Sequence, residues 1–336
     1  MSLRLLHPQP EHDANRIELD GGRELHLVEP IGKGASATVH RAILREPNGL
    51  GRRVAVKLWA SIASEEADHV LDVLTGVASR VACVEHANVA RVFACGMWRG
   101  RPYVVTELVA GVSLAQFHEA FTRKQRRMPL DLAIFIATEI AEALSAARTA
   151  RDHEGVKIGL LHQSLSAREV LLSFAGEVKV TDFESSLARA ASSSIRSLRG
   201  VAVRVATMAP EVAQGAEADA RSDVFSFGVL LRELFIGPRF PASTKNNEAI
   251  RLAREGYVEP HTFVPQLPAS LVAIMERCLE IDPELRYPSA SALVHELRRE
   301  ALKMGVGDGR YFLREAVQRE YAESEAITQE KAFPGQ

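Results

Sequence analysis

Apolar and polar residues alternate in short runs between residues 24 and 106, a pattern that predicts the strands of a twisted antiparallel sheet. Tight turns are expected at Pro47-Asn48-Gly49 and at Arg99-Gly100, because these residues favour chain reversals. From Ser64 to Cys83 the period changes, and apolar residues recur at helical spacing, which predicts one helix within this region. Those residues are Val70, Val73, Leu74, Val77 and Val81. Residues 1–23 are polar, with Pro8 and Pro10, and are interpreted as a leader.

Helical periodicity dominates the rest of the chain. It covers Leu130 to Ala150, Ser222 to Phe235, Leu271 to Glu280 and Ser289 to Lys303. A sheet-rich first part followed by a mainly helical second part predicts an α+β fold.

The last segment, residues 304–336, begins with the glycine-rich stretch 305–309 and continues as an amphipathic helix. Its apolar residues recur at spacings that place several of them on one helical face: Tyr311, Phe312, Leu313, Val317 and Tyr321, with Arg314, Glu315, Arg319 and Glu320 largely outside that face. Such a face must be covered, either by docking onto the helical part of the chain or by a protein partner.

Composition narrows the class of protein. The 336 residues are 46% hydrophobic and 25% charged, enough for one large domain with a substantial core. The net charge is only −2 and both signs are interspersed, so we expect neither nucleic acid nor a membrane surface as partner. The apolar run from Phe225 to Gly237 is broken by Arg232 and Glu233 and is too short to span a bilayer. A cytoplasmic location is the expectation.

Eight motifs occur in a fixed order through most of the chain. They are Ile31-Gly32-Lys33-Gly34-Ala35-Ser36-Ala37-Thr38-Val39, Val54-Ala55-Val56-Lys57, His86-Ala87-Asn88-Val89, His162-Gln163-Ser164-Leu165-Ser166-Ala167-Arg168-Glu169, Thr181-Asp182-Phe183-Glu184, Met208-Ala209-Pro210-Glu211, Asp223-Val224-Phe225-Ser226-Phe227-Gly228 and Asp282-Pro283-Glu284-Leu285-Arg286. In order and spacing they resemble the bacterial eukaryotic-like serine/threonine protein kinases. The resemblance implies a bilobal fold, with a small β-rich N-lobe containing one helix and a large mainly α-helical C-lobe.

The same resemblance implies domain boundaries. The kinase-like domain spans residues 24–303, with an N-lobe of residues 24–106, a hinge of residues 107–111 and a C-lobe of residues 112–303. Residues 1–23 precede it as a leader, and residues 304–336 follow it as an amphipathic tail.

A nucleotide cleft is also implied, with ATP and Mg²⁺ as cofactors. The positions that match the family's nucleotide contacts are Gly32, Gly34, Val39, Ala55, Lys57, Glu107, Val109, Leu171 and Asp182. Gly32 and Gly34 let backbone N–H groups approach phosphate oxygens, whereas Val39, Ala55 and Leu171 enclose the adenine ring. Asp182 and Glu169 are the candidate magnesium ligands, because carboxylate oxygens suit a hard cation. The alternative is that both carboxylates form a salt-bridge cluster with Lys57 that fills the phosphate site.

Several positions depart from the family pattern. Ser164 stands at the catalytic base, and Glu169 replaces the metal-binding Asn. Val77 stands where a glutamate would pair with Lys57, and Asp68 and Asp72 project elsewhere on that helix. Further departures are Ala37 at the third glycine, Gln163 at the arginine before the base, Glu184 at the glycine after Phe183, and Arg204 at the threonine that contacts the catalytic loop.

The chain is therefore identified as a degenerate, pseudokinase-like member of the family, with a regulatory or scaffolding role in serine/threonine phosphorylation signalling. Binding of ATP and Mg²⁺ is expected to be weak or absent, and the expected partner is an active kinase or another signalling protein. Two alternatives stay open: an unconventional active serine/threonine kinase, and a nucleotide-independent interaction module. The run Ser192–Ser197 is interpreted as a mobile loop or, alternatively, as a target of a partner kinase.

Residues that hold the fold together are retained. Glu211 and Arg286 are expected to form a buried ion pair in the large lobe. Asp223 is expected to accept hydrogen bonds from the backbone near His162 and Gln163. His162, Phe183, Val81 and Val92 are expected to stack as an apolar column.

Overall fold

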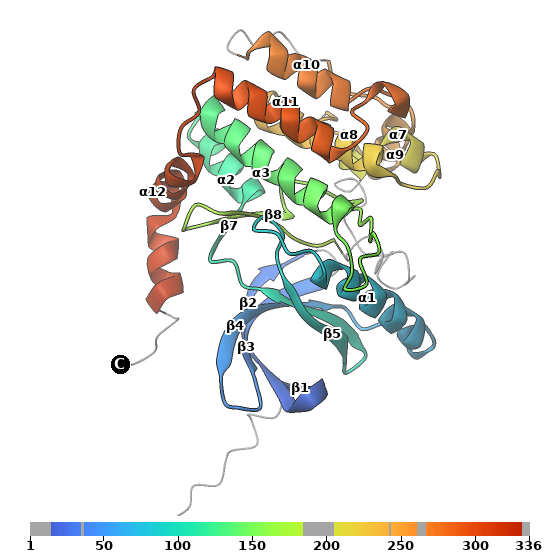
Figure 1. Cartoon of the computed structure of the whole chain (residues 1–336), viewed down its shortest axis with the longest axis vertical. Helices are drawn as coiled ribbons and strands as arrows, with labels where there is room; N and C mark the ends of the chain where they lie inside the picture. The colour runs from blue at the N-terminus through green and yellow to red at the C-terminus, as the bar shows by residue number, and fades with distance from the viewer. Residues whose placement is uncertain (1–14, 35–36, 184–204, 242, 261–266, 331–336) are drawn as a thin grey trace, which may run out of the picture. The chain divides into compact units, whose positions relative to one another are not determined.

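A computed structural model describes residues 15–34, 37–183, 205–241, 243–260 and 267–330 (Figure 1). Its contacts divide the chain into two compact units. The first unit includes residues 15–78 and 92–108 and holds an antiparallel six-stranded sheet of order β1-β2-β3-β4-β6-β5. The strands are β1 (Arg16–Leu19), β2 (Arg23–Lys33), β3 (Ala37–Arg45), β4 (Gly51–Trp59), β5 (Val92–Trp98) and β6 (Arg101–Glu107).

Alternation along these strands separates two faces of the sheet. One face forms the main core of the unit, with Leu25, Ala42, Val54, Val56 and Val105 all fully buried. Residues between them on each strand point to the opposite face, because side chains alternate along a strand. The two predicted turns are confirmed, and both use left-handed backbone: φ is +84° at Gly49, +51° at Arg99 and +70° at Gly100.

The predicted end of the leader, at residue 23, was wrong. Residues Arg16–Leu19 form β1, which pairs with β2 and is followed by the 3₁₀ turn η2 (Asp20–Gly22). Ile17 is buried in the core of the sheet and Leu19 packs against it, while Arg16 forms an ion pair with Glu24 at 2.5 Å. Two apolar residues in a polar segment were enough for an edge strand, because the neighbouring strand supplied the hydrogen bonds.

The helix predicted within the sheet region is confirmed as the short η3 (Ser64–Glu66) followed by α1 (Ala67–Ala82). Val70, Leu74, Val77 and Val81 are buried, and Val73 is half-buried. The spacing of these residues therefore identified the inner face of the helix.

The second unit includes residues 79–91 and 109–183 and the described residues from 205 onward. Its helices are α2 (Leu114–Arg123), α3 (Leu130–Thr149), α7 (Pro210–Ala213), α8 (Ala220–Phe235), α9 (Asn246–Arg254), α10 (Ala269–Cys278), α11 (Ala290–Lys303) and α12 (Gly309–Glu330), with the 3₁₀ turn η4 (Pro283–Leu285). A three-stranded sheet joins β7 (Gly111–Ser113), β8 (Val170–Ser173) and β9 (Val178–Val180) in that order. The four predicted helices are confirmed as α3, α8, α10 and α11, while α2, α7 and α9 were not predicted. In the described part of the chain, no helix is both long and apolar enough to cross a bilayer.

Helix α8 lies at the centre of this unit and contacts α3, α10 and α11 (Figure 1). Asp219 starts it, accepting hydrogen bonds from the backbone N–H groups of Arg221 and Ser222, while the Ser222 hydroxyl accepts one from the Asp219 backbone. This reciprocal cap satisfies donors that a helix start otherwise leaves unpaired. Even polar residues such as Asp223 and Ser226 are buried on α8, so the helix anchors other segments by hydrogen bonds.

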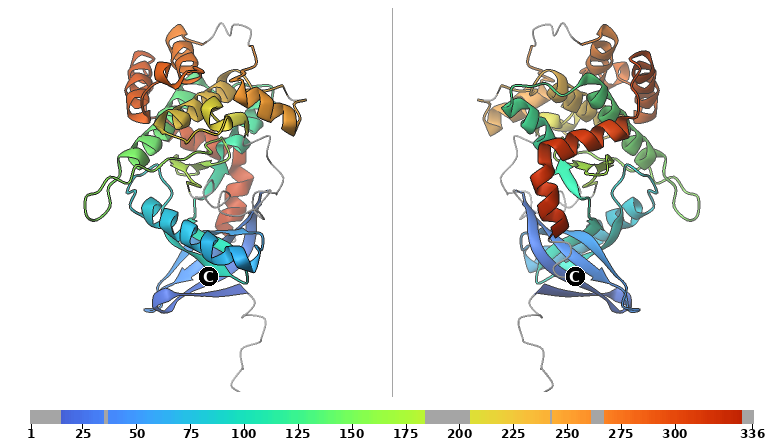
Figure 2. Two further views of the ribbon diagram at one scale, coloured as in Figure 1. Left: turned by 90° about the vertical axis from the view of Figure 1, so that its right-hand side faces the viewer. Right: turned by 90° about the vertical axis from the view of Figure 1, so that its left-hand side faces the viewer.

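The tail forms α12, and its expected docking on the helical part is confirmed. It contacts α2, α3, β7 and β8, with Leu313 and Val317 fully buried. Gly309 permits this approach, because a Cβ there would lie 2.3 Å from the Phe135 ring. The right-hand view of Figure 2 shows α12 as two straight segments meeting at an angle, and Tyr321 departs from helical geometry at φ −135°.

The structure shows which of the predicted residues form the docking face of α12, and it contradicts the prediction for Glu320. Tyr311 and Phe312 are about half exposed, at 49% and 47%, and Ala316 is buried instead. Glu320, predicted to lie outside, has a side chain only 1% exposed. It accepts hydrogen bonds from Lys124 and Arg126, and these two cations compensate its burial.

A chain ending at Lys303 is expected to unfold at a lower temperature. Loss of the buried Leu313 and Val317 removes about 3 kcal/mol or more of stability. That corresponds to a fall of roughly 6–12 °C in melting temperature for a unit of this size. Differential scanning calorimetry measures it, and a chain ending at Glu330 is the control that retains all of α12. An unchanged melting temperature after truncation at Lys303 would contradict stable docking.

Helix α12 is also expected to dock less tightly in acid. Burial raises the pKa of Glu320, but the hydrogen bonds from Lys124 and Arg126 outweigh it and hold the pKa below its usual value. A lowered folded-state pKa gives stability that is present above the unfolded pKa, about 4.3, and is lost as the pH falls through the folded value. The melting-temperature gap between the full chain and the chain ending at Lys303 should therefore shrink below about pH 4.

The control for this pH dependence is Glu320→Gln, which cannot ionise. The difference in melting temperature between this variant and the chain ending at Lys303 should be smaller at pH 7 than the difference for wild type. It should also vary less with pH. A gap in wild type that stays constant from pH 7 to pH 3 rules out the role assigned to Glu320.

Candidate functional site

Three predicted nucleotide residues lie together on the sheet of the first unit. Val39 in β3 is directly opposite Lys57 in β4, and Ala55 is two residues before Lys57 on the same face. All three are half-buried, in contrast to the fully buried Val54 and Val56 on the opposite face. The sheet register therefore brings two small apolar side chains and one cation to a common surface, and their contact with a nucleotide stays a prediction.

The glycine-rich segment has an internal hydrogen bond that bears on phosphate binding. The Gly34 N–H donates to the Ala37 carbonyl oxygen at 2.8 Å across residues 35–36, which lie outside the described residues. That donor is therefore already satisfied by the protein. Gly32 of β2 pairs with Val39 of β3, and a Cβ added at Gly32 would lie 3.6 Å from the Val39 side chain, an ordinary van der Waals distance. The backbone geometry thus requires a glycine at position 32 less strictly than the family pattern suggests.

Lys57 lies beside an aromatic ring on its own strand. Its Nζ is 5.3 Å from the centroid of the Trp59 ring. On α1, Val77 is 5% exposed, whereas Asp68 and Asp72 face solvent, as expected from the helical spacing. Trp59 had not been singled out from the sequence, although its position two residues after Lys57 was the available signal.

The two hinge residues lie at the end of β6 and in the short segment between β6 and β7. Glu107 is the last residue of β6 and pairs with Val54 of β4. In the second unit, Val109 is half-buried and precedes the close pairing of Gly111 with Ser173. A Cβ at Gly111 would lie 1.9 Å from the Leu172 carbonyl oxygen, so only glycine permits this pairing.

Leu171, one of the predicted adenine contacts, lies in β8, where it pairs with Ser113 of β7 and Lys179 of β9 and is half-buried. The fully buried Val170 and Leu172 on either side of it point to the other face.

The catalytic loop, residues 162–169, is fixed by the carboxylate of Asp223, as predicted. Its two oxygens accept hydrogen bonds from the backbone N–H groups of His162 and Gln163, both at 2.8 Å. Burial raises the pKa of Asp223 to about 6, and the two N–H donors oppose that rise. The carboxylate is therefore ionised at neutral pH and holds the loop through two charge-assisted bonds.

His162 connects this loop to the segment around Asp182. Its ring is 4.7 Å from the Phe183 ring, and its Nε2 is 2.9 Å from the Thr181 carbonyl oxygen. Both rings are buried and tilted by 48° to each other, so the predicted contact of these two residues is confirmed. The places of Val81 and Val92 in the predicted column stay a prediction.

Two non-glycine residues of the site have left-handed backbone. Gln163 has φ +61° and Asp182 has φ +69°. Such conformations carry strain and persist only where the surroundings over-determine them. Here the Asp223 bond to Gln163 and the backbone bond from Thr181 N–H to the Glu169 carbonyl oxygen, at 2.8 Å, supply that constraint.

The two predicted metal ligands lie on neighbouring segments, and Glu169 has a further partner. The Ser166 hydroxyl donates to Glu169 Oε2 at 2.5 Å. Ser166 thus stabilises a carboxylate at the position where the family has an amide. Among the described residues, no group of three or more His, Cys, Asp or Glu side chains is arranged to hold a metal ion. Any magnesium here would depend on Asp182, Glu169 and oxygen atoms of the nucleotide.

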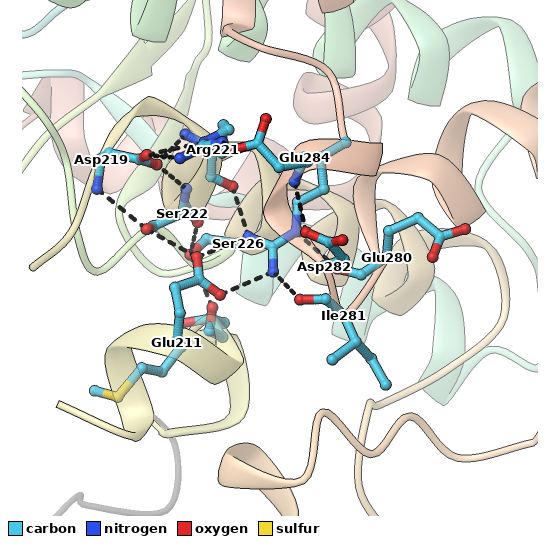
Figure 3. A network of polar contacts seen from close by, with 12 residues as sticks. Glu211, Asp219, Arg221, Ser222, Ser226, Glu280, Ile281, Asp282 and Glu284 are labelled. Atoms are coloured by element: carbon cyan, nitrogen blue, oxygen red, sulfur yellow. Dashed lines mark hydrogen bonds and ion pairs between the residues drawn. The ribbon is translucent and has the colours of Figure 1, made fainter. Parts of the chain in front are cut away.

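The predicted ion pair of the helical unit is confirmed. Arg286 donates from Nη1 and Nη2 to the two oxygens of Glu211, each at 2.8 Å, and its side chain is fully buried. Figure 3 shows Glu211 also receiving the Ser222 hydroxyl, near the Asp219 and Arg221 pair at the start of α8. Although burial alone would raise the pKa of Glu211, the Arg286 bonds hold it below its usual value.

A cavity of about 310 Å³ lies beside the catalytic loop within the second unit. Arg168, Thr207, Glu233 and Arg239 are among its lining residues. Burial raises the pKa of Glu233, and the nearby Arg168 opposes that rise. Sequence reasoning missed this cavity, because its walls come from the catalytic loop, α8 and the segment after α8.

Arg239 was also missed. It is 2% exposed and donates to the carbonyl oxygens of Ala206, Met208 and Tyr257, so it fixes the segment before α7. Three of the sequence-based predictions concern positions outside the described residues: Glu184, Ser192–Ser197 and Arg204.

The comparisons with known proteins agree with this geometry. The family model for protein tyrosine and serine/threonine kinases matches residues 25–297. The chain is similar to the tyrosine-protein kinase MasK of Myxococcus xanthus, at 29% identity over 81% of the chain and 42% of the relative. It is 30% identical to a probable serine/threonine-protein kinase of Clostridium acetobutylicum, over 81% of the chain and 39% of that protein. It is 33% identical to the serine/threonine-protein kinase PksC of Streptomyces coelicolor, over 84% of the chain and 50% of that protein.

The chain therefore belongs to the protein kinase family, with a β-sheet N-lobe and a helical C-lobe. Members of this family generally use ATP and Mg²⁺. The chain spans half the length of these relatives or less. Both β1 and α12 lie outside the matched range.

Replacement of Arg286 by methionine is expected to destabilise the protein by about 3–5 kcal/mol, because Glu211 would be left buried without its cation. Chemical denaturation monitored by circular dichroism measures this change. The matched control is Arg251→Met, which breaks exposed pairs with Glu248 and Glu255 and should leave stability almost unchanged. Similar small losses in both variants would contradict the structural role of the Arg286 pair.

Proposed function

We propose that the protein is a catalytically impaired kinase that regulates or scaffolds a partner in serine/threonine phosphorylation signalling. The observation that carries this proposal is Ser164 in an otherwise well-ordered catalytic loop. Asp223 holds the backbone of the residues just before it. A hydroxyl at this position cannot accept a proton as a carboxylate does, and loss of a general base typically costs about 10²–10⁴ in rate.

Two further features support the loss of phosphotransfer. Glu169 is a carboxylate hydrogen-bonded to Ser166, where the family uses an amide. Val77 is buried on α1, where the family uses a glutamate. Meanwhile the ion pair of Glu211 and Arg286 is intact, so what survives is the framework. A domain that keeps its fold while losing its reaction groups is suited to recognition.

The proposal includes weak binding of a nucleotide. Val39, Ala55 and Lys57 share one face of the sheet, which provides apolar contacts and a cation for ATP. The satisfied Gly34 N–H supports reduced affinity, since this donor is already used. Asp182 and Glu169 are the proposed magnesium ligands. The proposed partner is an active kinase or another signalling protein, in the cytoplasm.

An active protein kinase is the second candidate, favoured by the presence of Lys57 and Asp182 at the family's phosphate and metal positions. The names of the similar proteins fit this candidate as well, since they are serine/threonine or tyrosine kinases.

The purified protein is expected to transfer no more labelled phosphate to itself or to generic protein substrates than its Lys57→Met variant does. The reason is the missing base at Ser164. Incorporation from radiolabelled ATP, followed by phosphosite mapping, measures it. A paired variant, Ser164→Asp with Glu169→Asn, restores the family's residues and should raise the signal above this background. Robust phosphotransfer by wild type that disappears in Lys57→Met would instead establish the active kinase.

A further inference from the structure

Lys57 and Trp59 form a contact that the family resemblance does not account for. They are two residues apart on β4, so their side chains point to the same face of the sheet. The Lys57 Nζ lies 5.3 Å from the ring centroid, within the range at which a cation is attracted to an aromatic face. Tryptophan provides the strongest such attraction among the aromatic residues.

The Trp59 ring is held firmly. Its side chain is completely buried and packs with Leu74 of α1 and Val104 of β6. The Arg101 Nε donates to the Trp59 carbonyl oxygen at 2.7 Å, which fixes the end of the strand. A cation that contacts this ring meets a side chain that is already ordered. Trp59 therefore loses little further conformational entropy when the contact forms.

Helix α1 meets this face through apolar side chains. Leu74 touches Trp59, and Val77, one turn later, is buried at the position where the family has its glutamate. The apolar surroundings reduce water around the ring and thereby strengthen the attraction between cation and aromatic face. Trp59 therefore presents to Lys57 a ring that packs against apolar side chains.

We propose that Trp59 is a positioning residue for Lys57. Its ring orients the ammonium group toward a bound nucleotide phosphate, a task that the glutamate of α1 performs in the family. This proposal rests on the nucleotide binding proposed above. It assigns to Trp59 an effect on nucleotide affinity that passes through Lys57, in addition to its contribution to the core.

The first test needs no nucleotide. The chain has eight lysines, so selective ¹³C labelling of the lysine ε-carbons gives a spectrum simple enough to assign, with Lys57→Met identifying the Lys57 signal. In wild type, the ε-protons of Lys57 should be shifted upfield by the ring current of Trp59. Trp59→Leu should return them to the ordinary position, and Trp59→Phe should leave a smaller shift. An ordinary Lys57 signal in folded wild type overturns the proposal.

The second test measures affinity for a fluorescent ATP analogue in the presence of Mg²⁺. Trp59→Leu should bind about tenfold more weakly than wild type, with Trp59→Phe in between. In the Lys57→Met background, Trp59→Leu should have no further effect, because its influence passes through the lysine. The matched control is Trp98→Leu, which removes the second tryptophan and its Arg99 contact in β5.

The two tests separate the possible failures. An equal loss from Trp59→Leu with and without Lys57 would show that Trp59 acts only through packing, and the positioning role would be rejected. If wild type binds no nucleotide, the proposed nucleotide binding fails, while the lysine spectrum still decides whether Trp59 orients Lys57. Circular dichroism and melting temperature identify any variant that has lost its fold, and Trp59→Phe then provides the affinity comparison.

Discussion

The catalytic-loop region depends on one buried carboxylate. Asp223 lies on the most buried helix of the second unit and accepts the backbone N–H groups of His162 and Gln163. Because a buried carboxylate must be fully hydrogen-bonded, these two bonds fix the loop relative to α8. The left-handed backbone at Gln163 lies at one of these two bonds, and the neighbouring His162 ring contacts the ring of Phe183. The loop therefore keeps its geometry even though Ser164 stands at the place of the base.

A second constraint acts in the sheet of the first unit. Strand alternation separates the core residues Val54 and Val56 from Ala55 and Lys57, and the β3–β4 register places Val39 opposite Lys57. The same alternation puts Trp59 next to Lys57, so a lysine without the family's glutamate on α1 still has an ordered neighbour. The two-residue period of the strand therefore determines both the core packing and the geometry of the site in this unit.

Helix α12 is an addition to the matched family region, and it is integrated by both apolar and ionic contacts. Leu313 and Val317 pack inward, while Glu320 is enclosed by Lys124 and Arg126. Tyr321 donates to the Gln116 carbonyl oxygen at 2.6 Å, and Gln318 to that of Phe174 at 3.1 Å. These contacts reach α2 and the end of β8, the strand that carries Leu171. The tail is therefore a structural part of the helical unit, which favours self-docking over an effector segment free for a partner.

The sequence alone determined the fold class, α1, four main helices of the second unit and the hairpin turns, because the periods of strands and helices are local signals. It also determined which residues stand at the family positions, because the motifs occur in a fixed order. It misjudged β1 and the face of α12, because an edge strand and a docking face are chosen by the partner surface. Glu320 is the clearest case: its burial depends on Lys124 and Arg126, nearly 200 residues away. The tertiary structure alone also decided the hydrogen bond from Gly34 to Ala37, the link between Ser166 and Glu169, and the stacking of Lys57 on Trp59. Each depends on side-chain or backbone distances that residue spacing leaves open.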